Sequence, residues 1–400
     1  MSTSESIRSW GLRGLEALKL ALAVSLATLV FRAGLDAILE ARKHFTSPVL
    51  YALLASWPLL ALLSRPSREG SWWDGIRQIT DPWLGHLAGA SLGREGVGLR
   101  IGEWLALKFS AHSRPVEVSG LQANQRHLRH QDLQALCWAA GFTAIFHTPF
   151  AAMAWVMSEI RPQARSMSQW LGPSAWAAFG SGLAWLVAEA FGFHLHRWPI
   201  GPKAVEGVGQ FLWHISWLVP ATALAALVFL RVKAFVSERA AAPATLAGLW
   251  AAAGLLVFVG LQAGGGRGLM GLGLELFPMV GTSGVGGASM IELSPRIVVV
   301  SEVVLKLVLT ALFVGGGLRG GEVTPLLMCG SALGGFMAGP IGAGLGFVTL
   351  WGAVSGRAFP AVVMAWEVLG LGAGSLLTVF SAVVLARRLL GLFVDLKANS

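Results

Sequence analysis

Long apolar runs recur along this chain and constrain its fold more than any other feature. Several of them approach the roughly 20 residues that an α-helix needs to cross a bilayer. They are Leu20–Phe31, Leu133–Met157, Ala175–Phe191, Phe211–Phe229, Leu246–Leu261 and Ile297–Val314. Only 13% of the residues are charged, whereas soluble domains carry about a quarter charged residues. The sequence therefore predicts an all-α, multi-pass integral membrane protein and not a soluble protein with buried helices.

The net charge of +9 comes from lysines and arginines that lie mostly between the apolar runs. Examples are Arg126 with Arg129, Arg161 with Arg165, and Arg387 with Arg388. Basic loops favour the cytoplasmic face of a membrane and its acidic lipid head groups. The sequence contains no nucleic-acid-binding motif, so the charge indicates contact with the lipid bilayer and no nucleic-acid partner.

Glycine or proline interrupts three apolar segments, which is unusual for simple transmembrane helices. These segments are Leu84–Gly102, Gly264–Gly287 and Gly315–Gly342. Non-helical backbone at membrane depth is tolerated only where it faces protein or an aqueous cavity. In transporters, paired broken helices from two halves of the chain direct their N-termini at an anion near the midplane. The pattern favours a transporter or a channel.

The first broken segment contains "GREG", residues 93–96. Gly93 and Gly96 let the backbone approach an ion closely, and the amides that follow Gly93 would open a helix that binds anions at its N-terminus. Glu95 then lies where an anion would otherwise bind. A carboxylate there can occupy the site or leave it when protonated, which would couple proton and anion movement. A phosphate-binding glycine loop and a plain N-terminal cap are the alternatives.

The second broken segment contains "GGEVTP", residues 320–325. Pro325 suits the first turn of a new helix, so the preceding residues form loop backbone. Thr324 offers a hydroxyl to an anion, and the amides of the loop offer N–H groups. Glu322 needs a cation, a proton or water, and the alternative is that it pairs with Arg319 at the membrane edge.

A third element, residues 139–165, contains a Thr-Pro break at Thr148–Pro149 between two helices. The second of these helices ends at Glu159, close to Arg161. An acid at a helix end beside an arginine is most often a surface ion pair. Glu159 would be a candidate proton relay if it faces the protein interior.

These segments, together with "AVSGRAFPAVVMAWEVLG", occur in the order found in the CLC family of chloride channels and anion/proton antiporters, which the chain resembles from about Leu18 to Phe393. "GGEVTPL" is similar to the version in the fluoride-exporting branch. The resemblance implies a single transmembrane domain over residues 1–400, a bundle of tilted and broken helices. It implies two inverted repeats, at about 13–235 and 240–393, and a homodimer. No soluble regulatory domain is expected, and a bacterial inner membrane is the expected location.

The resemblance also implies roles for individual residues. Glu95 corresponds to the external gating glutamate, and Glu159 to the internal proton-transfer glutamate. The implied anion-binding residues are Ser71, Gly93, Arg94, Gly96, Gly321, Glu322, Val323, Thr324 and Phe393. Two of them depart from the family pattern. Ser71 in "GSWWDGIRQI" is the best match to the first anion-site motif, and Phe393 replaces a tyrosine whose hydroxyl phenylalanine lacks.

The leading hypothesis is fluoride export coupled to proton influx. A chloride channel or chloride/proton antiporter is the first alternative, and a transport-dead membrane protein that binds a halide is the second. The sequence shows no set of nucleophile and base and no cluster of metal ligands, so we expect no enzyme, no cofactor and no metal.

Overall fold

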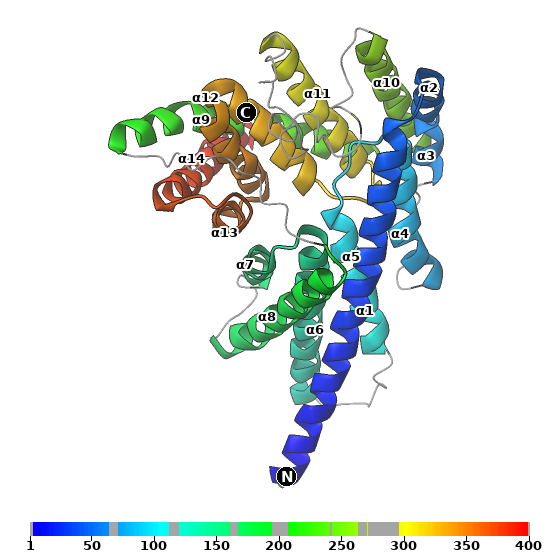
Figure 1. The fold of residues 1–400 in the computed structure, drawn as a ribbon, viewed down its shortest axis with the longest axis vertical. Coiled ribbons are helices and arrows are strands. Elements are labelled where there is room, and N and C mark those ends of the chain that lie inside the picture. The colour runs from blue at the N-terminus through cyan, green and yellow to red at the C-terminus, as the bar shows by residue number, and fades with distance from the viewer. Residues whose placement is uncertain are drawn as a thin grey trace. The chain divides into compact units, whose positions relative to one another are not determined.

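The computed structural model describes residues 3–63, 71–111, 120–160, 167–193, 207–240, 242–262, 270 and 296–398. The predicted segment Gly264–Gly287 lies outside the described residues, apart from Met270. Within the described part the secondary structure is helical (Figure 1). One isolated β-bridge joins two of the described loops. The helices predicted from the apolar runs are confirmed.

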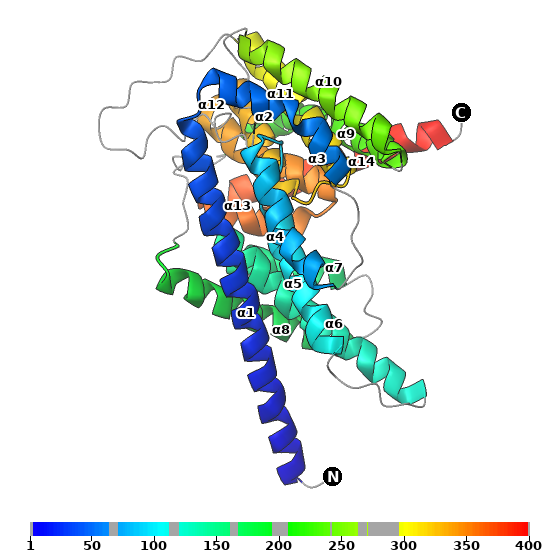
Figure 2. The ribbon, with the colours of Figure 1, turned by 90° about the vertical axis from the view of Figure 1, so that its right-hand side faces the viewer.

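The helices follow one another with short connections where both neighbours are described. In chain order they are α1 (Thr3–Lys43), α2 (Ser47–Ala55), α3 (Trp57–Leu63), α4 (Trp72–Leu87), α5 (Glu95–Ala111), α6 (Gly120–Phe146), α7 (Pro149–Ile160), α8 (Met167–Ala190), α9 (Val208–Arg239), α10 (Pro243–Gln262), α11 (Arg296–Gly315), α12 (Val323–Ser355), α13 (Ala358–Leu369) and α14 (Ala373–Ala398). Helix α1 runs without interruption over its whole length (Figure 2).

The chain forms two compact units. The first consists of residues 1–34, 67–79 and 95–195, and the second of residues 35–66, 80–94 and 196–400. Helices α1 and α4 each contribute residues to both units. The boundary at residues 94 and 95 falls within the "GREG" segment.

Glycines allow close helix packing in the first unit. A Cβ on Gly98 would lie 2.7 Å from the carbonyl oxygen of Gly141, and one on Gly102 would lie 2.7 Å from that of Cys137. The two contacts place α5 antiparallel to the second half of α6. Small residues permit such backbone approach between membrane helices, which explains their spacing in these apolar segments.

Helix α12 is a hairpin of two helical arms in the second unit. Its backbone leaves helical geometry at Ala338 and Gly339, and Gly339 has φ 62°. Across the hairpin, Gly330 faces Gly346 and Gly334 faces Gly342, so closely that a Cβ on any of them would collide with the backbone of its partner. The four glycines are therefore required for the two arms to meet.

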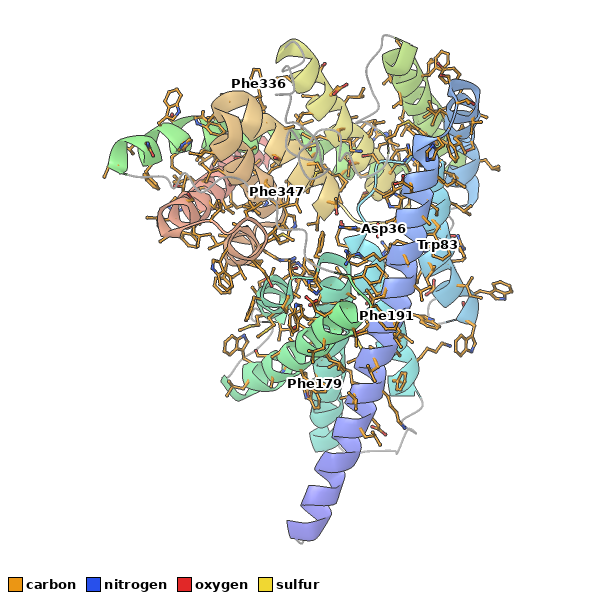
Figure 3. All side chains as sticks on the ribbon, in the orientation of Figure 1. Asp36, Trp83, Phe179, Phe191, Phe336 and Phe347 are labelled. Atoms are coloured by element: carbon orange, nitrogen blue, oxygen red, sulfur yellow. The ribbon has the colours of Figure 1, made fainter. Side chains whose placement is uncertain are left out.

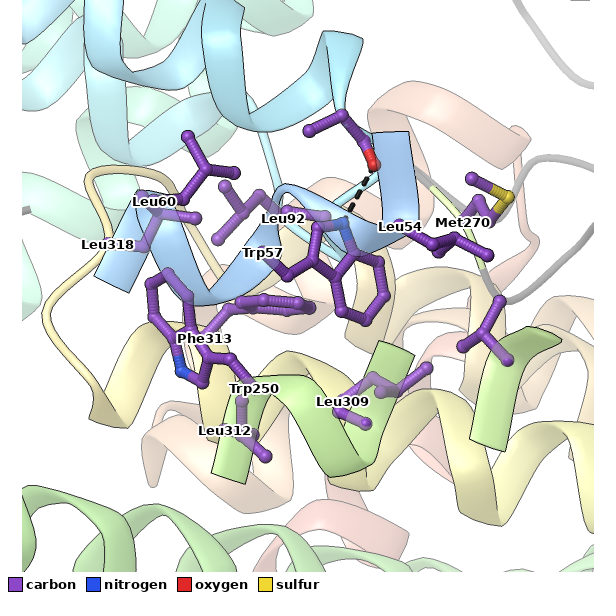
Figure 4. Close-up of a cluster of buried hydrophobic side chains, with 14 of the residues drawn as sticks. Leu54, Trp57, Leu60, Leu92, Trp250, Met270, Leu309, Leu312, Phe313 and Leu318 are labelled. Carbon is purple, nitrogen blue, oxygen red and sulfur yellow. Dashed lines mark hydrogen bonds between the residues drawn. The ribbon is translucent and has the colours of Figure 1, made fainter. Parts of the chain in front are cut away.

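An aromatic cluster in the second unit holds the loop after α4. Trp57 packs edge-on against Phe313 with ring centroids 4.8 Å apart, and Phe313 packs against Trp250 at 5.0 Å (Figure 4). The indole N–H of Trp57 donates a hydrogen bond of 2.8 Å to the carbonyl of Ala88. This bond fixes the first residue after α4 to α3.

Three described helices are long and apolar enough to cross a membrane, namely Gly14–Arg42, Val208–Arg239 and Ala373–Phe393. Large apolar side chains stand exposed along the helices. Phe179 is 41% exposed and Phe191 64% exposed (Figure 3). Because apolar residues exposed in such numbers favour lipid over water, these surfaces agree with a membrane environment.

Candidate functional site

Two loops with the same backbone geometry lead into α5 and α12. Helices α4 and α11 both end in a Schellman cap with glycine in the left-handed conformation that this cap requires. These glycines are Gly89, with φ 85°, and Gly317, with φ 84°. After α4, backbone N–H groups donate to carbonyls of that helix, from Ala88 to Leu84, from Gly89 to His86 and from Ala90 to Gly85. After α11 the equivalent bonds run from Gly316 to Leu312, from Gly317 to Val314 and from Leu318 to Phe313. The predicted interruptions in both apolar segments are confirmed.

The two loops meet at a pair of glycines, both in the second unit. Gly93 N–H donates to the carbonyl of Gly321 at 2.5 Å, and Gly321 N–H donates to the carbonyl of Gly93 at 2.7 Å. This exchange is the close pair of an antiparallel ladder. Gly93 lies two residues before α5, and Gly321 lies two residues before α12. The loops that begin the two helices are therefore joined by their backbones.

Buried polar contacts surround this bridge in the second unit. The hydroxyls of Ser91 and Thr310 lie 2.6 Å apart, and Arg319 Nε lies 3.7 Å from a carboxylate oxygen of Asp81. Ser91 and Arg319 occupy equivalent positions in the two loops, each two residues before its bridging glycine. Each loop is thus anchored by a polar side chain to the helix that precedes the other loop.

Glu322 pairs with Lys233 of α9, with 2.5 Å between the ammonium nitrogen and a carboxylate oxygen. The alternative considered from the sequence, a pair with Arg319, is wrong, because Arg319 approaches Asp81. Lys233 is 89 positions away from Glu322 in the chain, so no local pattern predicts the pair. It ties the residue before α12 to α9.

Removing one member of this pair is expected to destabilise the protein. The Lys233→Met variant leaves the Glu322 carboxylate without its cation, while Lys233→Met with Glu322→Gln removes the charge as well. We expect a favourable coupling energy of about 1 kcal/mol, since both side chains are partly exposed. Thermal unfolding of the wild type, both single variants and the double variant measures it, and additive effects would show that the pair contributes nothing.

The helix starts carry buried polar side chains. Glu95, the first residue of α5, is 1% exposed, and Thr324, the second residue of α12, is 4% exposed. The first N–H groups of a helix have no partner within the helix, and its dipole favours negative charge there. Each start can therefore receive an anion or hold a carboxylate such as that of Glu95. Glu95 belongs to the first unit and Thr324 to the second.

A family model described as "Voltage gated chloride channel" matches residues 58–391. The chain belongs to this family. The membership predicted from "GREG" and "GGEVTP" is confirmed, and so is the all-α membrane architecture.

Curated and solved relatives agree with this membership. A "Chloride/fluoride channel protein" from Pseudomonas syringae pv. tomato is 29% identical over 303 residues, which are 72% of this chain and 60% of that protein. The chain thus spans about 60% of the length of this curated relative.

Two solved structures share the fold over nearly the whole chain. One is a CLC-type fluoride/proton antiporter, with a TM-score of 0.72, 21% identity and coverage of 97% of this chain and 96% of that one. The other is a slow cyanobacterial Cl⁻/H⁺ antiporter, with a TM-score of 0.71 and 15% identity, which covers 95% of this chain and 94% of its own. At these identities the likeness shows the fold alone.

The hydroxyl of Ser71 has a structural role in this CLC chain. It accepts a hydrogen bond of 2.9 Å from the amide of Asp74 and so caps α4. The Ser71 carbonyl accepts a further bond of 3.0 Å from the indole of Trp104, in the same unit. Its role as an anion ligand stays a prediction.

The other predicted residues have separate surroundings. In the second unit, a guanidinium nitrogen of Arg94 lies 3.8 Å from a carboxylate oxygen of Asp36, which Figure 3 labels. Glu159 is partly buried near the end of α7, and its expected neighbour Arg161 lies outside the described residues. Phe393 is 48% exposed on α14. The roles assigned to these three residues stay predictions.

Sequence reasoning missed two buried groups of this CLC chain. His86 and Lys306 are both 0% exposed. Lys306 lies in α11, inside the apolar run Ile297–Val314, and an ionisable residue within such a run is by default a functional candidate. That signal was present in the sequence. Among the described residues no cluster of three metal-ligating side chains occurs.

Proposed function

We propose that this chain exports fluoride across a membrane in exchange for protons. The observation that carries the proposal is the Gly93–Gly321 bridge, which joins the loops leading into α5 and α12. Each of these helices begins with a buried polar residue suited to an anion pathway. Support for fluoride comes from "GGEVTP" and from the name of the Pseudomonas relative, which includes both chloride and fluoride.

Glu95 alternates in this proposal between two states. Ionised, its carboxylate occupies the anion position at the start of α5, where the helix dipole favours it. Protonated, it loses that attraction and leaves the position to the anion. Because the carboxylate and the anion compete for one position, proton binding and anion movement become linked.

Fluoride is small and strongly hydrated, so several well-placed donors must replace its water. The amides of residues 93–96 and 321–324, including that of Val323, and the hydroxyl of Thr324 supply them. The further assignments are that Glu159 transfers protons on the inner side and that Ser71 and Phe393 lie along the anion route. Two inverted repeats are supported by the matching caps after α4 and α11. We further propose a homodimer in a bacterial inner membrane.

Anion efflux from liposomes tests this function. Purified protein is reconstituted into vesicles loaded with potassium fluoride or potassium chloride, and efflux is started with valinomycin while external pH is recorded. We expect fluoride efflux, slower chloride efflux and proton uptake into the vesicles driven by the fluoride gradient. Equal chloride efflux would replace the proposal with a chloride transporter, and no flux of either ion would leave a halide-binding protein.

A further inference from the structure

His86 is a buried side chain whose ring nitrogens find no hydrogen-bond partner in the described part of the chain. It occupies the last turn of α4 and is 0% exposed. Neither ring nitrogen has a partner among the described residues. Buried polar groups are nearly always paired, and an unpaired one costs free energy. Among the described residues, the imidazole therefore has hydrogen-bonding capacity that a bound ligand could use.

In the described part of the chain, three cations act on the His86 ring. They are Arg42, Lys306 and Arg94, which come from α1, α11 and the loop before α5. Lys306 is fully buried. An Arg42 guanidinium nitrogen lies 3.3 Å from where a Cβ on Gly89 would be, three residues after His86. All four side chains belong to the second unit, so the cluster does not depend on how the two units are placed.

Hydrogen bonds hold the surrounding backbone in position. The Thr310 hydroxyl lies 2.9 Å from the carbonyl of Lys306 and 2.6 Å from the hydroxyl of Ser91. Ser91 lies between His86 and Arg94 in the loop. Arg94 also faces an acid: its guanidinium nitrogen Nη1 lies 3.8 Å from a carboxylate oxygen of Asp36, whose side chain is 48% exposed. Hydrogen bonds thus join the turn of α11 that carries Lys306 to the loop that carries Ser91.

We propose that His86, Arg42, Arg94 and Lys306 form a buried binding site for a small monovalent anion, distinct from the helix starts at Glu95 and Thr324. A neutral imidazole donates one N–H to the anion, and the three cations supply attraction in a buried environment where charge interactions are strong. The same cations repel a metal ion. A halide is the ligand class because the neutral imidazole offers a single N–H, which a monoatomic anion can accept from any direction.

Anomalous scattering from bromide can locate the site in crystals of the intact protein. Crystals of the wild type are soaked in sodium bromide, and an anomalous peak is expected within hydrogen-bond distance of a His86 ring nitrogen. Peaks elsewhere without one at His86 would overturn the inference. Bromide at His86 in a protein without flux would keep the inference and reject the proposed exporter, so the two failures are distinguishable.

Matched histidine variants separate binding from packing. His86→Leu removes the donor, and His214→Leu makes the same change at another buried histidine of the second unit, which no cation is found to influence. We expect the peak at His86 to vanish in the first variant and to persist in the second. Titration calorimetry with sodium bromide should show roughly tenfold weaker binding or one anion fewer for His86→Leu. Unchanged binding in a folded His86→Leu protein would contradict the proposal, and Lys306→Met provides a second variant if the first does not fold.

Discussion

Replacing Glu95 by glutamine is expected to abolish proton movement driven by a fluoride gradient. Glutamine has the shape of the protonated side chain but cannot ionise, so under the proposed mechanism it neither occupies the anion position as a carboxylate nor carries a proton. We expect proton uptake to fall to the level of protein-free vesicles, because the glutamine amide does not titrate and so cannot carry a proton. Liposome efflux with a pH electrode measures this change.

Glu103→Gln is the matched control, since Glu103 lies on the same helix with an exposed side chain. The control should keep both fluoride efflux and proton uptake near wild-type values. Glu95→Gln protein that still moves protons in the wild-type ratio to fluoride would remove Glu95 from the mechanism. Loss of proton uptake in both variants would point to the fold of α5 and not to the gate.

Adding one methyl group at Gly334 is expected to destabilise the α12 hairpin. The Cβ of Gly334→Ala would collide with the carbonyl oxygen of Gly342, which is backbone and cannot turn away. Overpacking of this kind costs about 1–3 kcal/mol, more than the gain of about 1 kcal/mol that alanine brings to a helix. Thermal unfolding in detergent should show a lower midpoint and a lower yield of folded protein.

Gly248→Ala makes the same substitution in α10, where a Cβ meets nothing within 4 Å. There the helix propensity of alanine acts alone, so stability should stay equal or rise. A Gly334→Ala protein as stable as Gly248→Ala would mean that the two arms of α12 separate at little cost. It would also mean that the close approach of Gly334 and Gly342 is not needed.

The breaks in the two apolar segments could be predicted because their causes are local. Gly89 and Gly317 adopt a left-handed backbone that other residues avoid, and Pro325 suits the first turn of α12. The helices themselves follow from the length and apolarity of their segments. These signals lie within a few residues of the structure that they specify.

The contacts between these segments could not be predicted in the same way. Glu322 has two cations in plausible reach, Arg319 three positions away and Lys233 in another helix, and only the folded chain selects Lys233. The hydroxyl of Ser71 is likewise engaged in capping α4, which its motif did not reveal. Choosing between partners requires knowing which segments meet, and spacing along the chain does not carry that information.

By itself, the sequence determined the membrane environment and the helices, and it suggested candidate residues for anion binding, because apolarity, glycine freedom and side-chain chemistry belong to each residue wherever it lies. The tertiary structure alone decided that Gly93 pairs with Gly321 and that His86 lies under the influence of Arg42, Arg94 and Lys306. Gly93 and Gly321 are 228 positions apart in the chain, and His86 and Lys306 are 220 positions apart. The physical reason is that burial and charge interactions act through space, so they are properties of the fold and not of any segment.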